Sequence, residues 1–398
     1  MHQHAAHNTD TDDRSTSSRD IEGDRGQPTA PEGRLRSLDS LRGIAALVVV
    51  GQHVLLSFPD SRNPVFNAAR LLFILGGQFA VILFFVLSGF VLTLPYTAGK
   101  ALGYGPFLVR RVCRLYAPFA FAVLVSAWLS GILGGASTPL VSDWLLHHWR
   151  PPLTGNVIAS HLLMTGIHDE AIRLDGPIWS LIVEMRVSII FPLLVLFATR
   201  FRWTGVAAAF VLSLACAKGR TVLGETSALT ADSPVGAVLF TAYYLLMFLI
   251  GATLATQMSR IQALFQRAPK ALHMASFGAL SVAFLALTYL TPPYLYRTVK
   301  DVFCGVFAGY VIACVVSFPR LQGALSLKGL IWLGDISYSF YLIHLPVLMA
   351  LIYVLYPIAP LWLIVSVALP LMLLAGHLMH HAVERPSLRF GRSLSQRL

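Results

Sequence analysis

Long apolar segments recur along the chain from Leu41 onward, separated by mostly short polar connections. Each runs for about 16–24 residues, and a helix of about 20 apolar residues is long enough to cross a bilayer. The pattern therefore predicts an all-α fold, a polytopic membrane bundle of about ten transmembrane helices. The ten segments lie near 43–58, 71–94, 115–134, 177–198, 203–217, 235–256, 271–290, 300–317, 338–356 and 361–383.

Two stretches differ from this pattern. Residues 1–33 are rich in His, Asp, Ser, Thr, Gly and Pro and hold almost no large apolar residue, which predicts a disordered N-terminal tail. We expect residues 34–398 to form one membrane domain. Its connection 135–176 is much longer than the others, and a long connection in a compact bundle is usually functional. Its aromatic and polar residues suit a sugar acceptor, or they anchor an interfacial loop.

Composition excludes a soluble globular protein. The 398 residues are 56% hydrophobic and 12% charged, against about 25% charged in soluble proteins, and the mean hydropathy is +0.67. Lys and Arg number 30 and Asp and Glu 19, for a formal net charge of +11. Because the basic residues lie between apolar segments, we interpret the surplus as membrane topology and expect no nucleic-acid partner.

The distribution of basic residues indicates an orientation. With the N-terminus inside, 18 basic residues fall in inner segments and 8 in outer connections. This is the bias that the positive-inside rule requires, and one helix more or fewer would destroy it. We therefore expect both termini in the cytoplasm, the connection 135–176 outside, and membrane lipids around the bundle.

Ionisable residues inside apolar segments are candidates for function, because placing them in a membrane is costly. His53 lies deep in the first segment, eleven residues after Arg42, which is about 16 Å along a helix. Arg42 would then lie at the cytoplasmic interface and His53 near mid-membrane. A neutral imidazole there can act as a general base near pH 7. The alternative is a hydrogen-bonded structural histidine.

Two further charges, Glu184 and Arg186, fall in the outer half of the fourth segment. Residues two apart on a helix face different directions, so we expect these charges to meet different partners. A buried Glu184 would orient His53 and stabilise its protonated form, as the third group of a catalytic triad does. The alternative is a structural ion pair between helices.

A pair of arginines and a polar stripe mark two other segments. Arg111 and Arg114 share one helix face at the cytoplasmic mouth of the third segment, which suits phosphate recognition. Snorkelling to anionic lipid headgroups is the alternative. Tyr338, Tyr341 and His344 form a stripe on the ninth segment, which either lines a cavity or bonds helices together.

Small and metal-type residues carry weaker signals. Ser88 and Gly89 indicate close helix approach in the second segment. His377, His380 and His381 have a spacing that metal sites use, but no carboxylate or Cys cluster accompanies them. We therefore predict interfacial histidines, no metal and no bound cofactor.

These residues together resemble the acyltransferase 3 family of integral membrane acyltransferases. In the fourth segment, Met185-Arg186-Val187 departs from the acidic and aromatic residues that many members have after the Glu. The resemblance rests on six features in family order: 38–45 (LDSLRGIA) leading to His53 in an Arg-x10-His pattern, 84–90 (FFVLSGF), Arg111-x-x-Arg114, Trp179-Ser-Leu with Glu184, 337–344 (SYSFYLIH) and Glu384-Arg-Pro386.

The resemblance implies transfer of an acyl group, usually acetyl, from coenzyme A to a hydroxyl. The implied acceptors are sugars of surface polysaccharides, lipopolysaccharide, nodulation factors or antibiotics, and the implied location is a bacterial inner (cytoplasmic) membrane. It maps His53 to the catalytic histidine, Arg42 to its basic partner, and Arg111 and Arg114 to the donor-binding motif. Some members carry a fused extracytoplasmic hydrolase-like domain. We expect this chain to lack it, so that any second transfer step would need another protein or would not occur.

We therefore expect an O-acyltransferase that uses acyl-coenzyme A, with acetyl-coenzyme A as the donor substrate. His53 would deprotonate a hydroxyl of a sugar in a surface polysaccharide or glycolipid, with an antibiotic or other small glycoside as the alternative acceptor. A different class is also compatible: a non-catalytic glycan or lipid transporter that uses buried His, Glu and Arg as a proton relay. We expect the site to be lined further by Arg186, Trp179, Ser88, Tyr338, Tyr341 and His344.

Overall fold

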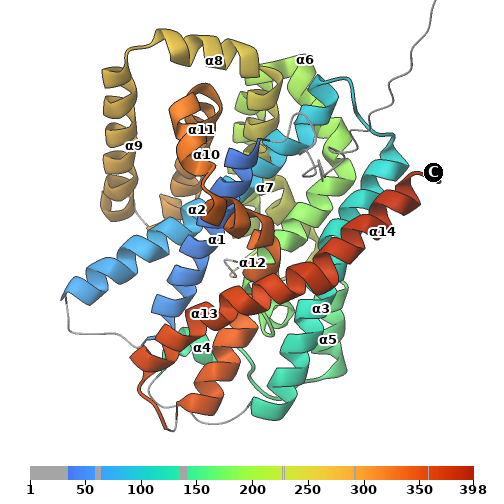
Figure 1. Cartoon of the computed structure of the whole chain (residues 1–398), viewed down its shortest axis with the longest axis vertical. Helices are drawn as coiled ribbons and strands as arrows, with labels where there is room; N and C mark the ends of the chain where they lie inside the picture. The colour runs from blue at the N-terminus through green and yellow to red at the C-terminus, as the bar shows by residue number, and fades with distance from the viewer. Residues whose placement is uncertain are drawn as a thin grey trace, which may run out of the picture. The chain divides into compact units, whose positions relative to one another are not determined.

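The computed structural model describes residues 35–58, 64–134, 141–225, 227, 229–290, 293–356 and 358–398. These are mostly helical, without a β-strand in the described ranges, and the predicted tail at 1–33 lies outside them. The elements, drawn in Figure 1, are α1 (Arg36–Leu56), α2 (Pro64–Thr97), α3 (Tyr104–Leu133), α4 (Asp143–Leu146), α5 (Gly155–Leu162), η1 (Asp169–Ile172), η2 (Gly176–Ile178), α6 (Trp179–Val222), α7 (Pro234–Thr256), α8 (Met258–Arg267), α9 (Lys270–Leu290), α10 (Pro293–Ser317), α11 (Pro319–Leu325), α12 (Lys328–Leu355), α13 (Leu361–Met379), η3 (His380–Glu384) and α14 (Arg385–Ser395).

The predicted membrane bundle is confirmed. In the part of the chain that the structure describes, nine helices are long and apolar enough to cross a membrane. Their outward surfaces carry large exposed apolar side chains, such as Trp128 and Leu196, that a bilayer would cover. The nine are α1, α2, α3, α6, α7, α9, α10, α12, and α13 with its continuation through α14.

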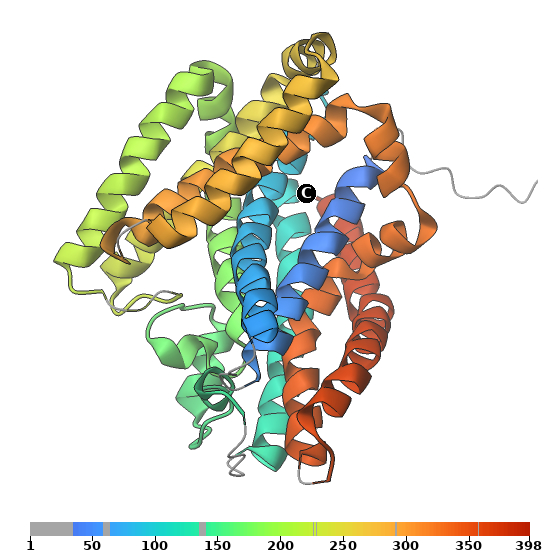
Figure 2. The same ribbon diagram turned by 90° about the vertical axis from the view of Figure 1, so that its left-hand side faces the viewer.

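α6 accounts for the difference between nine helices and ten predicted segments. It contains both 177–198 and 203–217, and at Arg202 its backbone leaves helical geometry, with φ 50° and ψ −127°. Figure 2 shows the ribbon bending sharply there. The ten apolar segments therefore all lie in helices, and the side on which the termini lie stays a prediction.

Two glycines bring α1 and α12 into close contact. A Cβ atom added at Gly43 would lie 2.6 Å from the backbone nitrogen of Gly334, and one added at Gly334 would lie 2.4 Å from the carbonyl oxygen of Asp39. Each glycine precedes a histidine by ten residues, His53 on α1 and His344 on α12. A helix rises about 15 Å over ten residues. Two helices that touch at the glycines and run in the same direction therefore bring both histidines to one level.

α2 and α7 approach each other by the same means. A Cβ atom at Gly89 would lie 2.0 Å from the carbonyl oxygen of Phe248, and one at Gly251 would lie 1.9 Å from that of Val86. The expected close helix approach at Gly89 is confirmed. The contact turns the neighbouring Ser88 toward α6, where its hydroxyl donates a hydrogen bond to the Glu184 carboxylate.

The described part of the long connection, 141–175, is anchored at the C-terminal end of α1. The Ser142 amide donates to the carbonyl oxygen of Ser57 at 3.2 Å. Trp149 is 2% exposed, and its Nε1 donates to Ser126 Oγ at 2.9 Å and to the Leu174 carbonyl oxygen at 3.1 Å. The segment is therefore packed against the bundle, and these contacts fix the position of α4, which is part of it.

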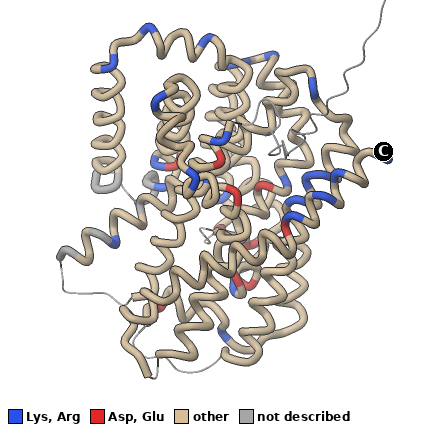
Figure 3. Tube along the Cα trace, in the orientation of Figure 1, with Lys and Arg blue, Asp and Glu red and all other residues tan. Residues whose placement is uncertain are grey.

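Basic side chains are distributed unevenly over the bundle. Figure 3 shows Lys and Arg gathered around α8, α11 and α14, and few at the end that carries α4 and α5. This asymmetry agrees with the sorting of basic residues made from the sequence, which assigns the first end to the cytoplasm.

Candidate functional site

Two histidines from different helices meet inside the bundle. Nδ1 of His53 on α1 lies 2.7 Å from Nε2 of His344 on α12. The two rings are parallel within 1° and their centroids are 5.0 Å apart, as a hydrogen bond in the plane of both rings requires. His344 is fully buried, and its Nδ1 lies 2.7 Å from the carbonyl oxygen of Tyr341. The sequence indicates each histidine separately but not that they form a pair.

These hydrogen bonds assign the ring protons. A carbonyl oxygen only accepts, so Nδ1 of His344 carries a hydrogen. In a neutral His344, Nε2 is then an acceptor, and His53 donates to it from Nδ1. Nε2 of a neutral His53 therefore keeps its lone pair, which is the state that a general base needs.

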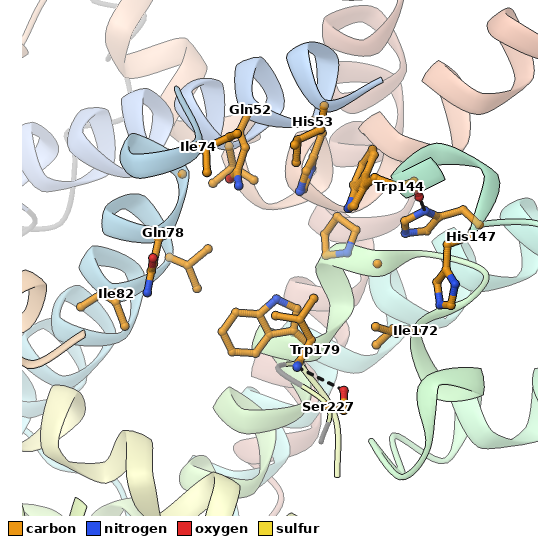
Figure 4. Close-up of a pocket in the computed structure, with 18 of the residues that line it drawn as sticks. Gln52, His53, Ile74, Gln78, Ile82, Trp144, His147, Ile172, Trp179 and Ser227 are labelled. Carbon is orange, nitrogen blue, oxygen red and sulfur yellow. Dashed lines mark hydrogen bonds between the residues drawn. The ribbon is translucent and has the colours of Figure 1, made fainter. Parts of the chain in front are cut away.

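The His53 ring lines a cavity of about 770 Å³, drawn in Figure 4. Trp144 of α4 stacks on the ring, with centroids 5.1 Å apart and planes at 16°. Trp179 at the start of α6 lines the same cavity, together with Gln52 and Gln78. Cavities that bind organic ligands usually hold about 300–1,000 Å³. The large cavity thus has room for a substrate beside the imidazole.

A second cavity of about 70 Å³ lies toward the N-terminal end of α1. Arg111 and Arg114 both line it, as their spacing on one helix face predicts, and Arg42 joins them from α1. Three guanidinium groups around one cavity suit an anionic ligand such as phosphate. We call it the arginine cavity; its other polar lining residues are Ser88, Ser180, Glu184, Ser337, Tyr338 and Tyr341.

Glu184 forms a buried ion pair in the arginine cavity. Its Oε1 lies 2.7 Å from Arg111 Nη2 and accepts a hydrogen bond from Ser88 Oγ at 2.7 Å. Nε of Arg111 donates to Ser188 Oγ at 3.2 Å. In the described residues, Glu184 therefore pairs with Arg111 and makes no hydrogen bond to His53. We expected Glu184 to orient His53; in the structure it contacts Arg111 instead.

Arg42 and Tyr338 complete the arginine cavity. Arg42 Nη1 lies 3.4 Å from Asp39 Oδ1, one turn earlier on α1. The Tyr338 hydroxyl donates to the carbonyl oxygen of Leu115 at 2.7 Å and so joins α12 to α3. Arg42 and His53 line different cavities, which agrees with their predicted separation along the helix.

Tyr341 lines both cavities and lies between them. Its hydroxyl lies 2.9 Å from Ser180 Oγ and donates to the carbonyl oxygen of Pro177 at 2.9 Å. The ring meets Phe84 edge-on, with centroids 5.7 Å apart. Of the predicted polar stripe, Tyr338 and Tyr341 therefore line cavities and also bond helices together, whereas His344 lines neither cavity and contacts the site through His53.

Arg186 has partners of its own, as expected from its spacing. Its guanidinium donates to the carbonyl oxygen of Ala237 at 3.3 Å, to Thr241 Oγ1 at 3.2 Å and to the carbonyl oxygen of Thr165. These contacts join α6 to α7 and to the segment 141–175. Arg186 lines neither of the two cavities, so the structure does not bring it together with His53.

Two buried histidines of the segment 141–175 act as uncharged hydrogen-bonding groups. Nδ1 of His148 donates to the carbonyl oxygen of Trp144 at 3.0 Å, and burial lowers the pKa of His148 to about 4. Nδ1 of His161 donates to the carbonyl oxygen of Val157 at 2.7 Å, while its Nε2 accepts from the Leu174 amide at 3.1 Å. Burial lowers the pKa of His161 to about 4 as well. Both rings are therefore neutral at pH 7.

Sequence reasoning missed a polar group on another wall of the large cavity. Asp301 and Arg297 of α10 line it with Gln78 of α2, and Asp301 is 1% exposed. We call these three residues the Asp301 cluster. A signal existed, because Gln78 and Asp301 are polar residues within the predicted segments 71–94 and 300–317.

The histidines near the end of α13 take part in hydrogen bonds. His380 Nδ1 lies 3.0 Å from Glu384 Oε2, which also accepts from Ser339 Oγ at 2.6 Å. Nε of Arg385 donates to His380 Nε2 at 3.2 Å. Within the described ranges, no group of three or more His, Cys, Asp or Glu side chains is placed to hold a metal ion.

Comparisons with known proteins bear on the same residues. A family described as an acyltransferase domain matches residues 35–380. The chain is similar to YrhL of Bacillus subtilis, which carries the provisional name peptidoglycan O-acetyltransferase, with 30% identity over 388 residues. That alignment covers 91% of this chain and 56% of YrhL, so the chain spans little more than half of that relative. No solved structure matches the chain.

Two other relatives are similar over shorter stretches. The acyltransferase MdmB of Streptomyces mycarofaciens is 26% identical over 336 residues, which cover 79% of each chain. Protein 2 in the picA locus of Rhizobium radiobacter is 32% identical over 175 residues, which cover 41% of this chain and 83% of that protein. With the family match extending over most of the chain, and over both cavities described above, this protein belongs to the acyltransferase 3 family of integral membrane acyltransferases.

Proposed function

We propose that this protein transfers an acetyl group from cytoplasmic acyl-coenzyme A to a hydroxyl of a sugar in a surface polysaccharide or glycolipid, in the bacterial inner membrane. The main observation that supports the proposal is the position of His53. It lines a substrate-sized cavity, its hydrogen bonds leave Nε2 with a lone pair, and an arginine cavity adjoins at Tyr341. Family membership supports acyl transfer, and the name of YrhL supports a glycan acceptor.

The arginine cavity is the proposed donor end. Coenzyme A carries phosphate groups at one end of a long arm and the thioester at the other. Arg42 lies about 16 Å from His53 along α1, so it acts with Arg111 and Arg114 on the phosphate end of the donor and not on the acyl carbonyl. Glu184 holds the Arg111 guanidinium in place. The arm passes Tyr341 to bring the thioester to His53.

The proposed chemistry uses one base and one leaving thiolate. The acceptor hydroxyl binds in the large cavity near His53 Nε2, which removes its proton while the oxygen attacks the thioester carbonyl carbon. The tetrahedral intermediate collapses with cleavage of the carbon–sulfur bond. The coenzyme A thiolate leaves and takes the proton from the His53 imidazolium. His344 accepts a hydrogen bond from His53 Nδ1 throughout, so the ring keeps its orientation.

The test compares the protein with its His53→Ala variant in proteoliposomes that contain acetyl-coenzyme A labelled in the acetyl group and a surface-glycan extract. We expect acetyl transfer to fall by about 10²–10⁴-fold, the usual contribution of a general base. His168→Ala, an exposed histidine of the outer segment, serves as the control and should retain transfer. Full transfer by His53→Ala would contradict the proposal.

The same assay separates the enzyme from a transporter. An acyltransferase consumes the thioester only when the acceptor is present and places the label on the glycan. A transporter with buried ionisable groups moves its cargo without cleaving the thioester. Label on a small glycoside, and none on polysaccharide or glycolipid, would assign the alternative acceptor class.

A further inference from the structure

The Asp301 cluster has no part in the proposed transfer chemistry. Asp301 accepts a hydrogen bond from Gln78 Nε2, and its Oδ2 accepts another from the Tyr243 hydroxyl at 3.0 Å. Nε of Arg297 lies 3.8 Å from Asp301 Oδ2, and its Nη2 donates to the Tyr244 hydroxyl at 3.1 Å. The cluster thus links α2, α7 and α10 around one buried carboxylate.

Helix packing alone does not explain why these charges lie at a cavity. A structural ion pair in an apolar span is favoured when protein groups surround both charges. Here the Arg297 side chain is 36% exposed, and it lines the large cavity together with Asp301 and Gln78. The cluster therefore presents hydrogen-bond donors and an acceptor to whatever occupies the cavity.

An aromatic surface lies beside this polar wall. Figure 4 shows Trp179 and Gln78 projecting into the cavity that His53 lines. The Trp179 ring packs against Tyr244, with centroids 5.6 Å apart, and this contact helps to fix its orientation. A pyranose ring has apolar C–H faces and a polar hydroxyl edge, so an indole face with hydrogen-bonding groups at its side matches both.

The chemistry of the cluster indicates the kind of sugar. A hydroxyl both donates and accepts, so two adjacent hydroxyls match a guanidinium that donates and a carboxylate that accepts. The charges of Arg297 and Asp301 already balance each other. A neutral ring leaves this ion pair intact, whereas an acidic sugar would compete with Asp301 for the Arg297 guanidinium and leave the buried carboxylate without its counter-charge, which disfavours its binding.

We propose that Gln78, Arg297 and Asp301, with Trp179 as the stacking surface, bind an uncharged pyranoside ring of the acceptor through two adjacent hydroxyls. This inference rests on the proposed function, because the bound ring is the one that delivers a hydroxyl of the same or a neighbouring sugar to His53.

The test measures binding without turnover. The full chain in nanodiscs is titrated with three neutral disaccharides, cellobiose, chitobiose and maltose, and the rise in thermal unfolding midpoint gives the affinity. We expect at least one of them to stabilise the protein, and its counterpart with a terminal uronic acid to bind more weakly. Failure of all three neutral probes to stabilise the protein, or stronger binding of the acidic counterpart, would overturn the inference.

Variants separate ligand binding from helix packing. Asp301→Asn should weaken binding of the neutral disaccharide by about ten- to hundredfold, because hydrogen bonds to charged groups are the strong ones. Arg297→Gln, at a partly exposed position, is the second variant in case Asp301→Asn does not fold. Tyr243→Phe removes a hydrogen bond to Asp301 from a residue that does not line the cavity, and should bind like the unchanged chain. Equal losses in Tyr243→Phe and Arg297→Gln would show a packing role instead.

A parallel measurement distinguishes failure of the subsite from failure of the proposed function. His53→Ala should bind the disaccharide normally while its acetyl transfer falls by about 10²–10⁴-fold. Acceptor-dependent thioester cleavage that survives in Arg297→Gln with unchanged KM for the acceptor would overturn the subsite alone. Disaccharide binding that depends on Arg297, without thioester cleavage by the unchanged chain, would overturn the enzyme proposal alone.

Discussion

A histidine serves as a base at a cavity only if one ring nitrogen keeps its lone pair turned toward the substrate. His344 provides this for His53, because the Tyr341 carbonyl oxygen holds its Nδ1 hydrogen and leaves Nε2 as the acceptor. The buried carboxylate Glu184 acts on a different group, the Arg111 guanidinium. At the scale of residues, the function that we propose assigns proton transfer to the His53–His344 pair and donor binding to the Glu184–Arg111 pair.

Replacing His344 tests its role as a positioning residue. We expect His344→Leu to lower kcat by about 10²–10⁴-fold with little change in the KM of either substrate, because His53 loses the group that sets its tautomer. His344→Gln keeps an acceptor near His53 Nδ1 and should recover part of the loss. Steady-state kinetics and the pH dependence of kcat measure this. Equal loss in both variants, with lower thermal stability, would indicate packing alone.

The Glu184–Arg111 pair gives a second prediction. Removing one partner of a buried ion pair costs about 3–5 kcal/mol of stability, because the other charge is left uncompensated, whereas removing both can be nearly neutral. We therefore expect Glu184→Gln to lower the thermal unfolding midpoint and Glu184→Gln with Arg111→Met to restore it.

The double variant should still bind acetyl-coenzyme A more weakly than the unchanged chain, since one of the guanidinium groups that we propose to bind phosphate is missing. Calorimetric titration with coenzyme A checks this expectation. Unchanged affinity in the double variant would remove Arg111 from the donor site.

At the scale of elements, the position of His53 follows from two helices and one outer segment. α1 and α12 touch at Gly43 and Gly334, so their histidines meet ten residues further on. The segment 141–175 then places the Trp144 ring on the free face of His53. That segment is held by buried neutral histidines, which makes its docking sensitive to acid.

The stability of the segment 141–175 should decrease as the pH falls. The folded-state pKa of His148 and of His161 is about 4, below the ordinary value of 6.5, so the unfolded segment binds protons more readily. The stabilisation is full above pH 6.5 and is lost as the pH falls from 6.5 to about 4, by roughly 3 kcal/mol for each histidine.

Limited proteolysis within the segment 141–175, measured from pH 7.5 to pH 4 in nanodiscs, should report this loss. In His161→Gln we expect about half of the acid sensitivity in that window to disappear, because one of two titrating groups of similar pKa is gone. Acid sensitivity equal to that of the unchanged chain would contradict the assignment to His161.

At the scale of the whole molecule, the two cavities lie on either side of Tyr341 along a bundle whose basic residues gather at one end. The function that we propose, with a cytoplasmic donor and an acceptor at the cell surface, needs two such approaches. From the charge asymmetry we predict that the arginine cavity faces the cytoplasmic side and the segment 141–175 the outer side.

Cysteine labelling tests this orientation. In a background without native cysteines, a membrane-impermeant maleimide should label Arg150→Cys in intact cells and Gln396→Cys only after permeabilisation. Both positions are exposed, so both should react in detergent, which is the control. Labelling of Gln396→Cys in intact cells would reverse the orientation. The native cysteines to be replaced are Cys113, Cys216, Cys304 and Cys314.

The sequence by itself determined the membrane class, the apolar spans and several polar residues of the two cavities, but not the Asp301 cluster. A bilayer accepts only long apolar helices, so the spans can be recognised from composition along the chain, and a few polar residues within them stand out by their cost. His53, Arg111, Glu184 and His344 could all be identified in this way.

Only the tertiary structure decided which of these residues act together. His53 and His344 are 291 residues apart, and their contact depends on the close packing of α1 and α12. Glu184 pairs with Arg111 and not with His53 because α3 and α6 pack against each other. Local periodicity records which face of a helix is apolar, but it does not record which helix that face meets. Partners across the bundle are set by packing between helices distant in the chain.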